Sequence, residues 1–180
     1  MTAVSSFIDV LHTDRPAQDR ADKMGLYEWF IGQWDMDVTT YEQNGAAHSG
    51  SGEIHVGWVL EGRAIQDVWM IPPRAKRGPS APILPVAGNW YGTTLRVYDP
   101  GLDAWHILWS DPATQFYTRQ IGRARGHDIV QEGKLDSGDI LRWSFTEITS
   151  NSFHWLGEHS ADGGASWRLQ VDIRARRVAG

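Results

Sequence analysis

Asp67, His106 and Tyr117 are the side chains with which this sequence could move a proton inside an apolar site. Imidazole titrates near neutral pH, and a carboxyl or phenol in a dry cavity can serve as an acid or a base. Asp67 is singled out because both faces of the segment 63–71 are apolar apart from one polar residue, Gln66 or Asp67. A buried carboxylate needs partners. We therefore expect Asp67 either to pair with Arg96 or Arg119 or to face a ligand.

Ten tryptophans in 180 residues supply a second kind of chemistry, a wall that could hold a ligand. Nine of them lie in segments that alternate apolar and polar residues. More large amphipathic rings than a core requires indicate a cavity that touches a small molecule, although an aromatic core is the ordinary alternative. The residues predicted to contact the ligand are Trp69, Tyr91, Trp109, Tyr117, Trp143 and Trp155.

Other chemistries lack their motifs. The seven histidines form no His-x-His or His-Glu-x-x-His pattern, so we expect no metal site. No Gly-x-Ser-x-Gly turn is present, and the glycines lie in predicted hairpin turns without a following helix, which disfavours a serine nucleophile and a phosphate cradle. The absence of cysteine excludes thiol chemistry and disulfides. We accordingly predict no cofactor.

Charge and hydropathy restrict the partners. The net charge is −5, with a pI near 5.7, and the arginines are scattered, which argues against nucleic acid as a partner. The sequence contains no signal-peptide pattern and no apolar stretch of membrane-spanning length, so we expect a cytoplasmic protein without a membrane partner. Several predicted strands carry apolar residues on both faces, which is compatible with a homodimer.

The period of the sequence changes at Gly32. Before it, apolar residues at helical spacing from Met24 to Ile31 predict a short helix, preceded by a polar arm at 1–23. After it, apolar and polar residues alternate between turns rich in glycine, proline, asparagine and aspartate. Such a meander has two exposed edges unless it closes. We predict an all-β domain over 24–180, a closed antiparallel up-and-down barrel of about ten strands with the helix capping one end. The strands are placed at 33–41, 48–60, 63–71, 89–98, 104–110, 114–122, 127–134, 139–148, 152–160 and 165–176.

Alternation also predicts which side chains face the interior. The faces with the clearest apolar pattern are Trp34/Met36/Val38, Ile54/Val56/Trp58/Leu60, Trp105/Ile107/Trp109, Leu141/Trp143/Phe145, Phe153/Trp155 and Trp167/Leu169/Val171/Ile173. The sets Tyr91/Thr93/Leu95/Val97 and Tyr117/Arg119/Ile121 are also predicted to face inward, on a less regular pattern. The proline-rich segment 72–88 is predicted to be a flap over the open end, or else a surface insertion.

Several motifs together resemble a known fold family. Phe30-Ile31-Gly32-Gln33-Trp34 after a short helix is similar to the Gly-x-Trp motif that begins the first strand of lipocalins and other calycins. The run from Tyr91-Gly92 to Tyr98-Asp99 resembles a bacterial family of uncharacterised calycin-like domains, as does Phe153-His154-Trp155 with Glu158, Ser160, Asp162-Gly163-Gly164 and Trp167. The likeness covers about residues 24 to 177. It implies a closed barrel with an inner cavity, and an arginine, Arg174 or Arg176, packed over Trp34.

Two functions remain open from the sequence. One is a binding module that holds a small hydrophobic or aromatic molecule in the barrel. The other is a cofactor-independent enzyme, an isomerase, cyclase or lyase, in which Asp67, Tyr117 or His106 transfers a proton. Nitrobindin-type barrels of similar strand number bind haem through a histidine, a role open to His106, His154 or His159, but no spacing selects one of them.

Overall fold

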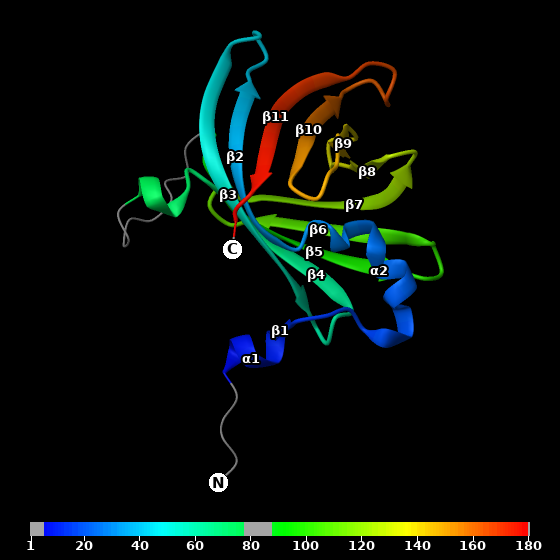
Figure 1. Cartoon of the computed structure of the whole chain (residues 1–180). Coiled ribbons are helices and arrows are strands. Elements are labelled where there is room, and N and C mark those ends of the chain that lie inside the picture. Colours follow the sequence, from blue (N-terminus) through cyan, green and yellow to red (C-terminus); the bar gives the residue numbers. More distant parts are fainter. Residues whose placement is uncertain (1–5, 78–87, 180) are drawn as a thin grey trace.

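The chain folds into a closed barrel of ten antiparallel strands with one additional short strand (Figure 1). The computed structural model describes residues 6–77 and 88–179. Strands β2 to β11 each pair with the next along the chain, and β11 pairs with β2, so the barrel has no free edge. The predicted closed up-and-down barrel is confirmed. Its strands are β2 (Gly32–Tyr41), β3 (Ala47–Val59), β4 (Ala64–Ile71), β5 (Trp90–Asp99), β6 (Ala104–Asp111), β7 (Phe116–Arg125), β8 (Asp128–Lys134), β9 (Ile140–Thr146), β10 (Ser152–Ser160) and β11 (Arg168–Arg177).

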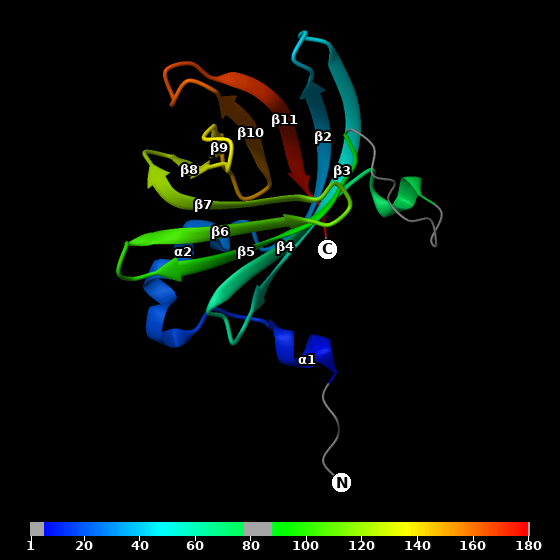
Figure 2. The same ribbon diagram turned by 180° about the vertical axis from the view of Figure 1, so that it is seen from behind.

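The helix α2 (Ala21–Glu28) closes one end of the barrel. Met24, Tyr27 and the following Phe30 are fully buried there. The Tyr27 ring lies edge-on to Trp105, with ring centres 5.0 Å apart, and Phe30 packs on Phe145 at 5.3 Å. Both views show α2 beside β4, β5 and β6 (Figure 2). The contacts join the helix to the beginning of β6 and the end of β9, so this end of the lumen is filled by side chains.

The N-terminal segment lies outside the barrel. It contains the helix α1 (Phe7–Leu11), the strand β1 (His12–Thr13), which pairs with the end of β3, and the 3-10 turn η1 (Gln18–Arg20). The amide of Ala17 donates a 3.0 Å hydrogen bond to the carbonyl of Gly62. A side chain at Gly62 would collide with the backbone of residues 15–17, so glycine at this turn lets the segment dock. No helix among the described residues has the length and apolarity needed to cross a membrane.

The inward faces of β5 and β7 differ from the prediction. Trp90, Gly92, Thr94, Arg96 and Tyr98 face the interior, while Tyr91 is 45% exposed. On β7, Thr118, Gln120 and Gly122 face inward and Tyr117 is 54% exposed. The apolar-alternation rule failed because both strands bury polar side chains. The barrel interior supplies an ion-pair partner for Arg96, and an inward glycine at 122 leaves room for the Tyr27 hydroxyl.

The last strand also departs from the prediction at its start. The register between β10 and β11 shifts at Gly157/Glu158, which leaves Gln170 unpaired in the ladder. Val171 and Ile173 face inward as expected, but Trp167 precedes the strand and stacks on Arg142, whose guanidinium carbon is 3.8 Å from the indole centre. A β-bulge cannot be read from alternation, because it adds one residue to one strand only.

Candidate functional site

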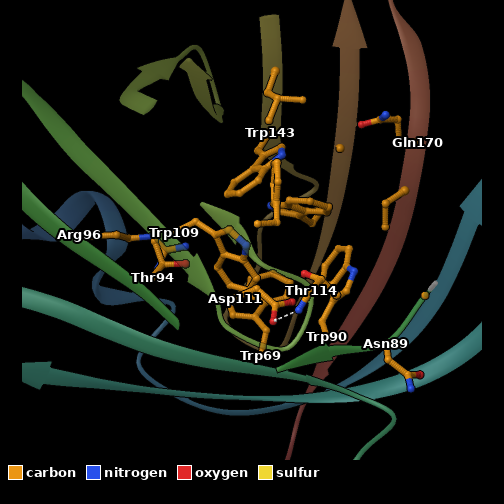
Figure 3. A pocket seen from close by; sticks show the side chains of 16 residues that line it. Trp69, Asn89, Trp90, Thr94, Arg96, Trp109, Asp111, Thr114, Trp143 and Gln170 are labelled. Atoms are coloured by element: carbon orange, nitrogen blue, oxygen red, sulfur yellow. Dashed lines mark hydrogen bonds between the residues drawn. The ribbon is translucent and has the colours of Figure 1, made fainter. Parts of the chain in front are cut away.

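A cavity of about 260 Å³ occupies the barrel at the end opposite α2. Its wall includes the first residue of β5, the last residue of β6 and the first residue of β7, whereas α2 contacts the other ends of these strands. The lining residues are Trp69, Gly88, Asn89, Trp90, Thr94, Arg96, Trp109, Asp111, Thr114, Phe116, Leu141, Trp143, Trp155, Gly157, Gln170 and Val171 (Figure 3). The volume of about 260 Å³ lies just below the range for ligand pockets, roughly 300–1,000 Å³.

Four of the five lining tryptophans form a closed ring of neighbours. The ring centres of Trp90 and Trp109 are 6.2 Å apart, and those of Trp109 and Trp143 are 6.0 Å apart. Trp155 completes the circuit at 5.6 Å from Trp143 and 6.2 Å from Trp90. The successive planes are steeply inclined, at 66°, 89°, 54° and 77°. We call these four residues the indole ring; the fifth, Trp69, packs on Trp155 at 5.6 Å.

Two glycines provide the space for these indoles. A Cβ atom at Gly92 would collide with the Cζ2 and Cη2 atoms of Trp109. A Cβ atom at Gly157 would lie 2.9 Å from Cη2 of Trp155. Gly92 lies on β5, next to the strand that carries Trp109, and Gly157 lies on β10, the strand that carries Trp155. The six-membered part of each indole therefore lies close to the backbone of a glycine. Two of the four rings thus occupy space that a side chain at the neighbouring glycine would fill.

A buried ion pair lies at the inner end of the cavity. The guanidinium of Arg96 donates from Nη1 to Oδ2 of Asp67, and the amide of Thr94 donates a 2.9 Å hydrogen bond to Oδ1. Both charged residues are 2% exposed or less. The rings of Phe30 and Tyr27 lie 5.2 and 5.3 Å from the guanidinium carbon. The pair is therefore held between polar and aromatic partners, which a charge needs when it leaves water.

Tyr27 links this ion pair to the closed end of the barrel. Its hydroxyl accepts a 2.8 Å hydrogen bond from Nε2 of Gln131. Burial raises the pKa of Tyr27 to about 12, and the nearby Arg96 guanidinium only partly opposes the shift. The phenol therefore stays protonated at neutral pH, and Tyr27 serves as a fixed polar contact in the core.

Asp111 contributes a carboxylate to the cavity wall. It is 1% exposed, and its Oδ1 accepts hydrogen bonds from the amides of Ala113 and Thr114 at 2.9 and 3.2 Å. Figure 3 shows it beside Thr114, with the bond between them drawn. No ion pair joins Asp111 to a basic side chain within residues 6–77 and 88–179. This carboxylate lines the cavity, and no basic side chain of the described residues balances it.

The predicted ligand contacts divide into two groups. The structure brings Trp69, Trp109, Trp143 and Trp155 together around the cavity. Tyr91 and Tyr117, predicted to line the lumen, lie on the outer surface instead. The Tyr91 ring lies 5.6 Å from the guanidinium carbon of Arg77, and the Tyr117 hydroxyl donates to Gln115 at 3.2 Å. The slip of one residue in the assigned face of β5 and β7 moved both to the wrong side.

The predicted proton-transfer residues are not gathered at one site. Asp67 is bonded to Arg96, one of its two expected partners, and His106 lies on the outside of β6. Its Nε2 is 2.9 Å from Oδ2 of Asp99, and its Nδ1 is 3.2 Å from an Arg119 nitrogen. Tyr117 is exposed on β7. None of Asp67, His106 and Tyr117 belongs to the residues that line the cavity.

The histidines considered for haem are also outside the lumen. Nε2 of His159 lies 2.9 Å from Asp139, and Nε2 of His154 lies 2.9 Å from Asp172. Neither these nor His106 lines the cavity, so the residues that the structure describes there do not fit axial ligation of haem.

Trp90, Asp111, Thr94 and Arg96 are cavity residues that the sequence reasoning missed. Trp90 is next to Tyr91 in the sequence. Assigning the opposite face of β5 to the interior would have predicted that Trp90 lines the cavity. Asp111 precedes a proline and reads as a turn residue. The signal that it also faces the lumen is its spacing of two residues from Trp109.

The segment 72–88 was predicted to be a flap, but residues 78–87 lie outside the described residues. Its described beginning contains the turn η2 (Arg74–Lys76), which is tied to β3. Glu53 accepts hydrogen bonds of 2.9 Å from the amide and from Nε of Arg74. Burial alone would raise the pKa of Glu53, but these bonds outweigh it and lower the pKa to about 2. The flap itself remains a prediction.

The Gly-x-Trp motif has its arginine, at a position other than the two expected. Arg177 lies over Trp34, with its guanidinium carbon 4.1 Å from the indole centre. It donates to the carbonyl of Ile31 at 2.7 Å, and a Cβ at Gly32 would lie 2.6 Å from its Nη1. The expectation of Arg174 or Arg176 was wrong because the β2–β11 register sets Arg177 opposite Trp34. Those two arginines instead pair outside with Glu147 and Asp37.

The similarity of this chain to known proteins lies in its fold. No protein-family model matches the chain, and no curated protein matches it. The structure of Rv2717c from M. tuberculosis superposes with a TM-score of 0.58 at 12% identity, covering 91% of this chain and 99% of that one. The S-type phycobiliprotein lyase CPES from Guillardia theta gives 0.55 at 9% identity, with the same coverages. These neighbours fit a calycin-like fold. At such identities the similarity concerns the fold alone, and function has to be argued from the site.

Proposed function

We propose that this protein binds a small, largely apolar or aromatic molecule in the cavity, among Trp69 and the indole ring. The observation that carries this proposal is the combination of an open volume of about 260 Å³ with five indoles around it. A packed aromatic core would leave no such space, because protein interiors approach the density of organic crystals. The neighbouring fold of a phycobiliprotein lyase is compatible with a barrel that takes up a small molecule.

Binding without chemistry is the simpler of the two functions considered. Catalysis through Asp67, His106 and Tyr117 has no support from their positions, since Asp67 is engaged by Arg96 and the other two face outward. An isomerase or lyase in this cavity would have to use other groups, with Asp111 as the available carboxylate. The aromatic wall requires no such group to retain a ligand by burial and stacking.

The proposal is tested by titrating the protein with benzyl alcohol, cyclohexanol and octanoate. Calorimetry and tryptophan fluorescence monitor the binding during each titration. We expect at least one of these probes to bind with a saturable signal. Val171→Phe, which adds volume at a cavity-lining position, should abolish that signal, whereas Tyr117→Phe on the outer surface should leave it unchanged. A probe that binds Val171→Phe as well as the original protein would place binding elsewhere and contradict the proposal.

A further inference from the structure

We propose that the preferred ligand is a small organic cation, an ammonium group carrying an apolar body, held inside the indole ring and balanced by Asp111. This inference rests on the proposed function, because it assigns a chemical class to the molecule bound in the same cavity. It follows from the arrangement of the rings, from the charges on the wall and from the state of the arginine at the inner end.

The first observation is the geometry of the indole ring. Its four sides measure 5.6, 6.0, 6.2 and 6.2 Å between neighbouring ring centres. In a square of this size the central point lies about 4 Å from each ring centre, within the roughly 6 Å over which a cation is attracted to an aromatic face. The steep angles between neighbouring planes mean that the rings are not stacked as a pile. Tryptophan provides the strongest such attraction among the aromatic side chains.

The second observation is the charge of the wall. Among the described residues that line the cavity, two are charged, Arg96 and Asp111. The charge of Arg96 is balanced by Asp67 directly behind it, which leaves the negative charge of Asp111. Removing a carboxylate from water without a counter-charge is costly, and a bound cation would restore the balance. Asp111 lies two residues along β6 from Trp109, so the carboxylate and the indole ring belong to one wall.

The third observation disfavours an anionic ligand. Arg96 is the one cation on the described part of the wall that could receive a carboxylate or phosphate, but it is 2% exposed, bonded to Asp67 and enclosed by Tyr27 and Phe30. An anion would approach the carboxylate of Asp67, which already balances Arg96, and that of Asp111 at the same time. The described wall therefore favours positive charge at the centre of the cavity and apolar groups around it.

Choline and 3,3-dimethylbutan-1-ol provide the test, because they have nearly the same shape and differ by the replacement of the quaternary nitrogen by carbon. We expect calorimetry to give a dissociation constant at least tenfold lower for choline. If the neutral alcohol binds as tightly as choline or more tightly, the cation inference is overturned while the proposed function stands. If neither compound binds and benzyl alcohol, cyclohexanol and octanoate do not bind either, both proposals fail.

Asp111→Asn separates charge from shape. The amide oxygen of asparagine can accept the same two backbone hydrogen bonds from Ala113 and Thr114, so the turn is retained. We expect choline to bind at least tenfold more weakly to this variant and the neutral alcohol to bind within twofold of its original affinity. Asp14→Asn, at a side chain 97% exposed in the N-terminal segment, removes one charge far from the cavity and should change neither affinity. An unchanged choline affinity in Asp111→Asn would overturn the inference. The comparison of choline with its isostere in the unaltered protein does not depend on any variant folding.

Discussion

Trp105 and Trp109 offer a direct test of whether the barrel is hollow where the cavity is placed. They lie on the same strand, β6, with the same inward direction, and both are largely buried at 2% and 8% exposure. Trp105 packs against Tyr27 and Tyr98 at the closed end, whereas Trp109 faces the cavity. Replacing each by alanine removes the same atoms from two environments that differ in their packing.

Trp105→Ala should cost about 3–5 kcal/mol of unfolding free energy, the usual range for deleting a fully packed aromatic side chain. Trp109→Ala should cost about 1–3 kcal/mol, because part of the indole surface borders the existing space and forfeits fewer contacts when it is removed. Urea unfolding at pH 7, monitored by both circular dichroism and fluorescence, gives the two values. Equal costs, or a larger cost for Trp109→Ala, would mean that its ring is packed on every side, and the reasoning would be refuted.

Three further predictions concern the parts that build the site. Asp67→Asn should destabilise the protein by about 3–5 kcal/mol in urea unfolding, since it leaves Arg96 buried with a weakened partner; a change below about 1 kcal/mol would show that the pair is not structural. Gly92→Ala should cost about 1–3 kcal/mol and displace Trp109, seen as altered near-ultraviolet circular dichroism, whereas Gly50→Ala, with open space around it, should stay within about 0.5 kcal/mol. The pKa of Tyr27 is raised to about 12 from an ordinary value of 10.0, so its contribution is complete below pH 10 and lost as pH rises toward 12. Tyr27→Phe should flatten the fall of stability over that alkaline range, and an unchanged slope in urea unfolding at stepped pH would contradict the burial argument.

The barrel was predictable from the sequence because its strands follow a strict local rule. Alternation between turns rich in glycine, proline, asparagine and aspartate located all ten strands close to their observed bounds, and the need to remove two sheet edges predicted closure. The helix before Gly32 was equally predictable from the helical spacing of its apolar residues, and it caps one end of the barrel. These properties depend on neighbours along the chain, which the sequence displays directly.

The site was predictable only where apolar residues mark the interior. Trp109, Trp143 and Trp155 lie on faces that are apolar throughout, and they line the cavity. Tyr91 and Tyr117 were misplaced because β5 and β7 bury the polar side chains of Arg96 and Gln120. The ion-pair partner of Arg96 comes from a different strand. Arg96 can be buried because it forms an ion pair with Asp67, which is 29 residues away in the sequence. Such compensation between strands leaves no local periodic signal.

The most direct test of the central claim uses fluorine NMR of the protein labelled with 5-fluorotryptophan, with each of the ten resonances assigned by single Trp→Phe variants. At saturation with whichever probe binds, the account predicts that the resonances of Trp69, Trp90, Trp109, Trp143 and Trp155 shift. The resonances of Trp34 and Trp105, which are packed at the α2 end, should remain in place. Shifts confined to tryptophans outside the cavity, or no shift with any of the probes, would contradict a ligand site inside the barrel.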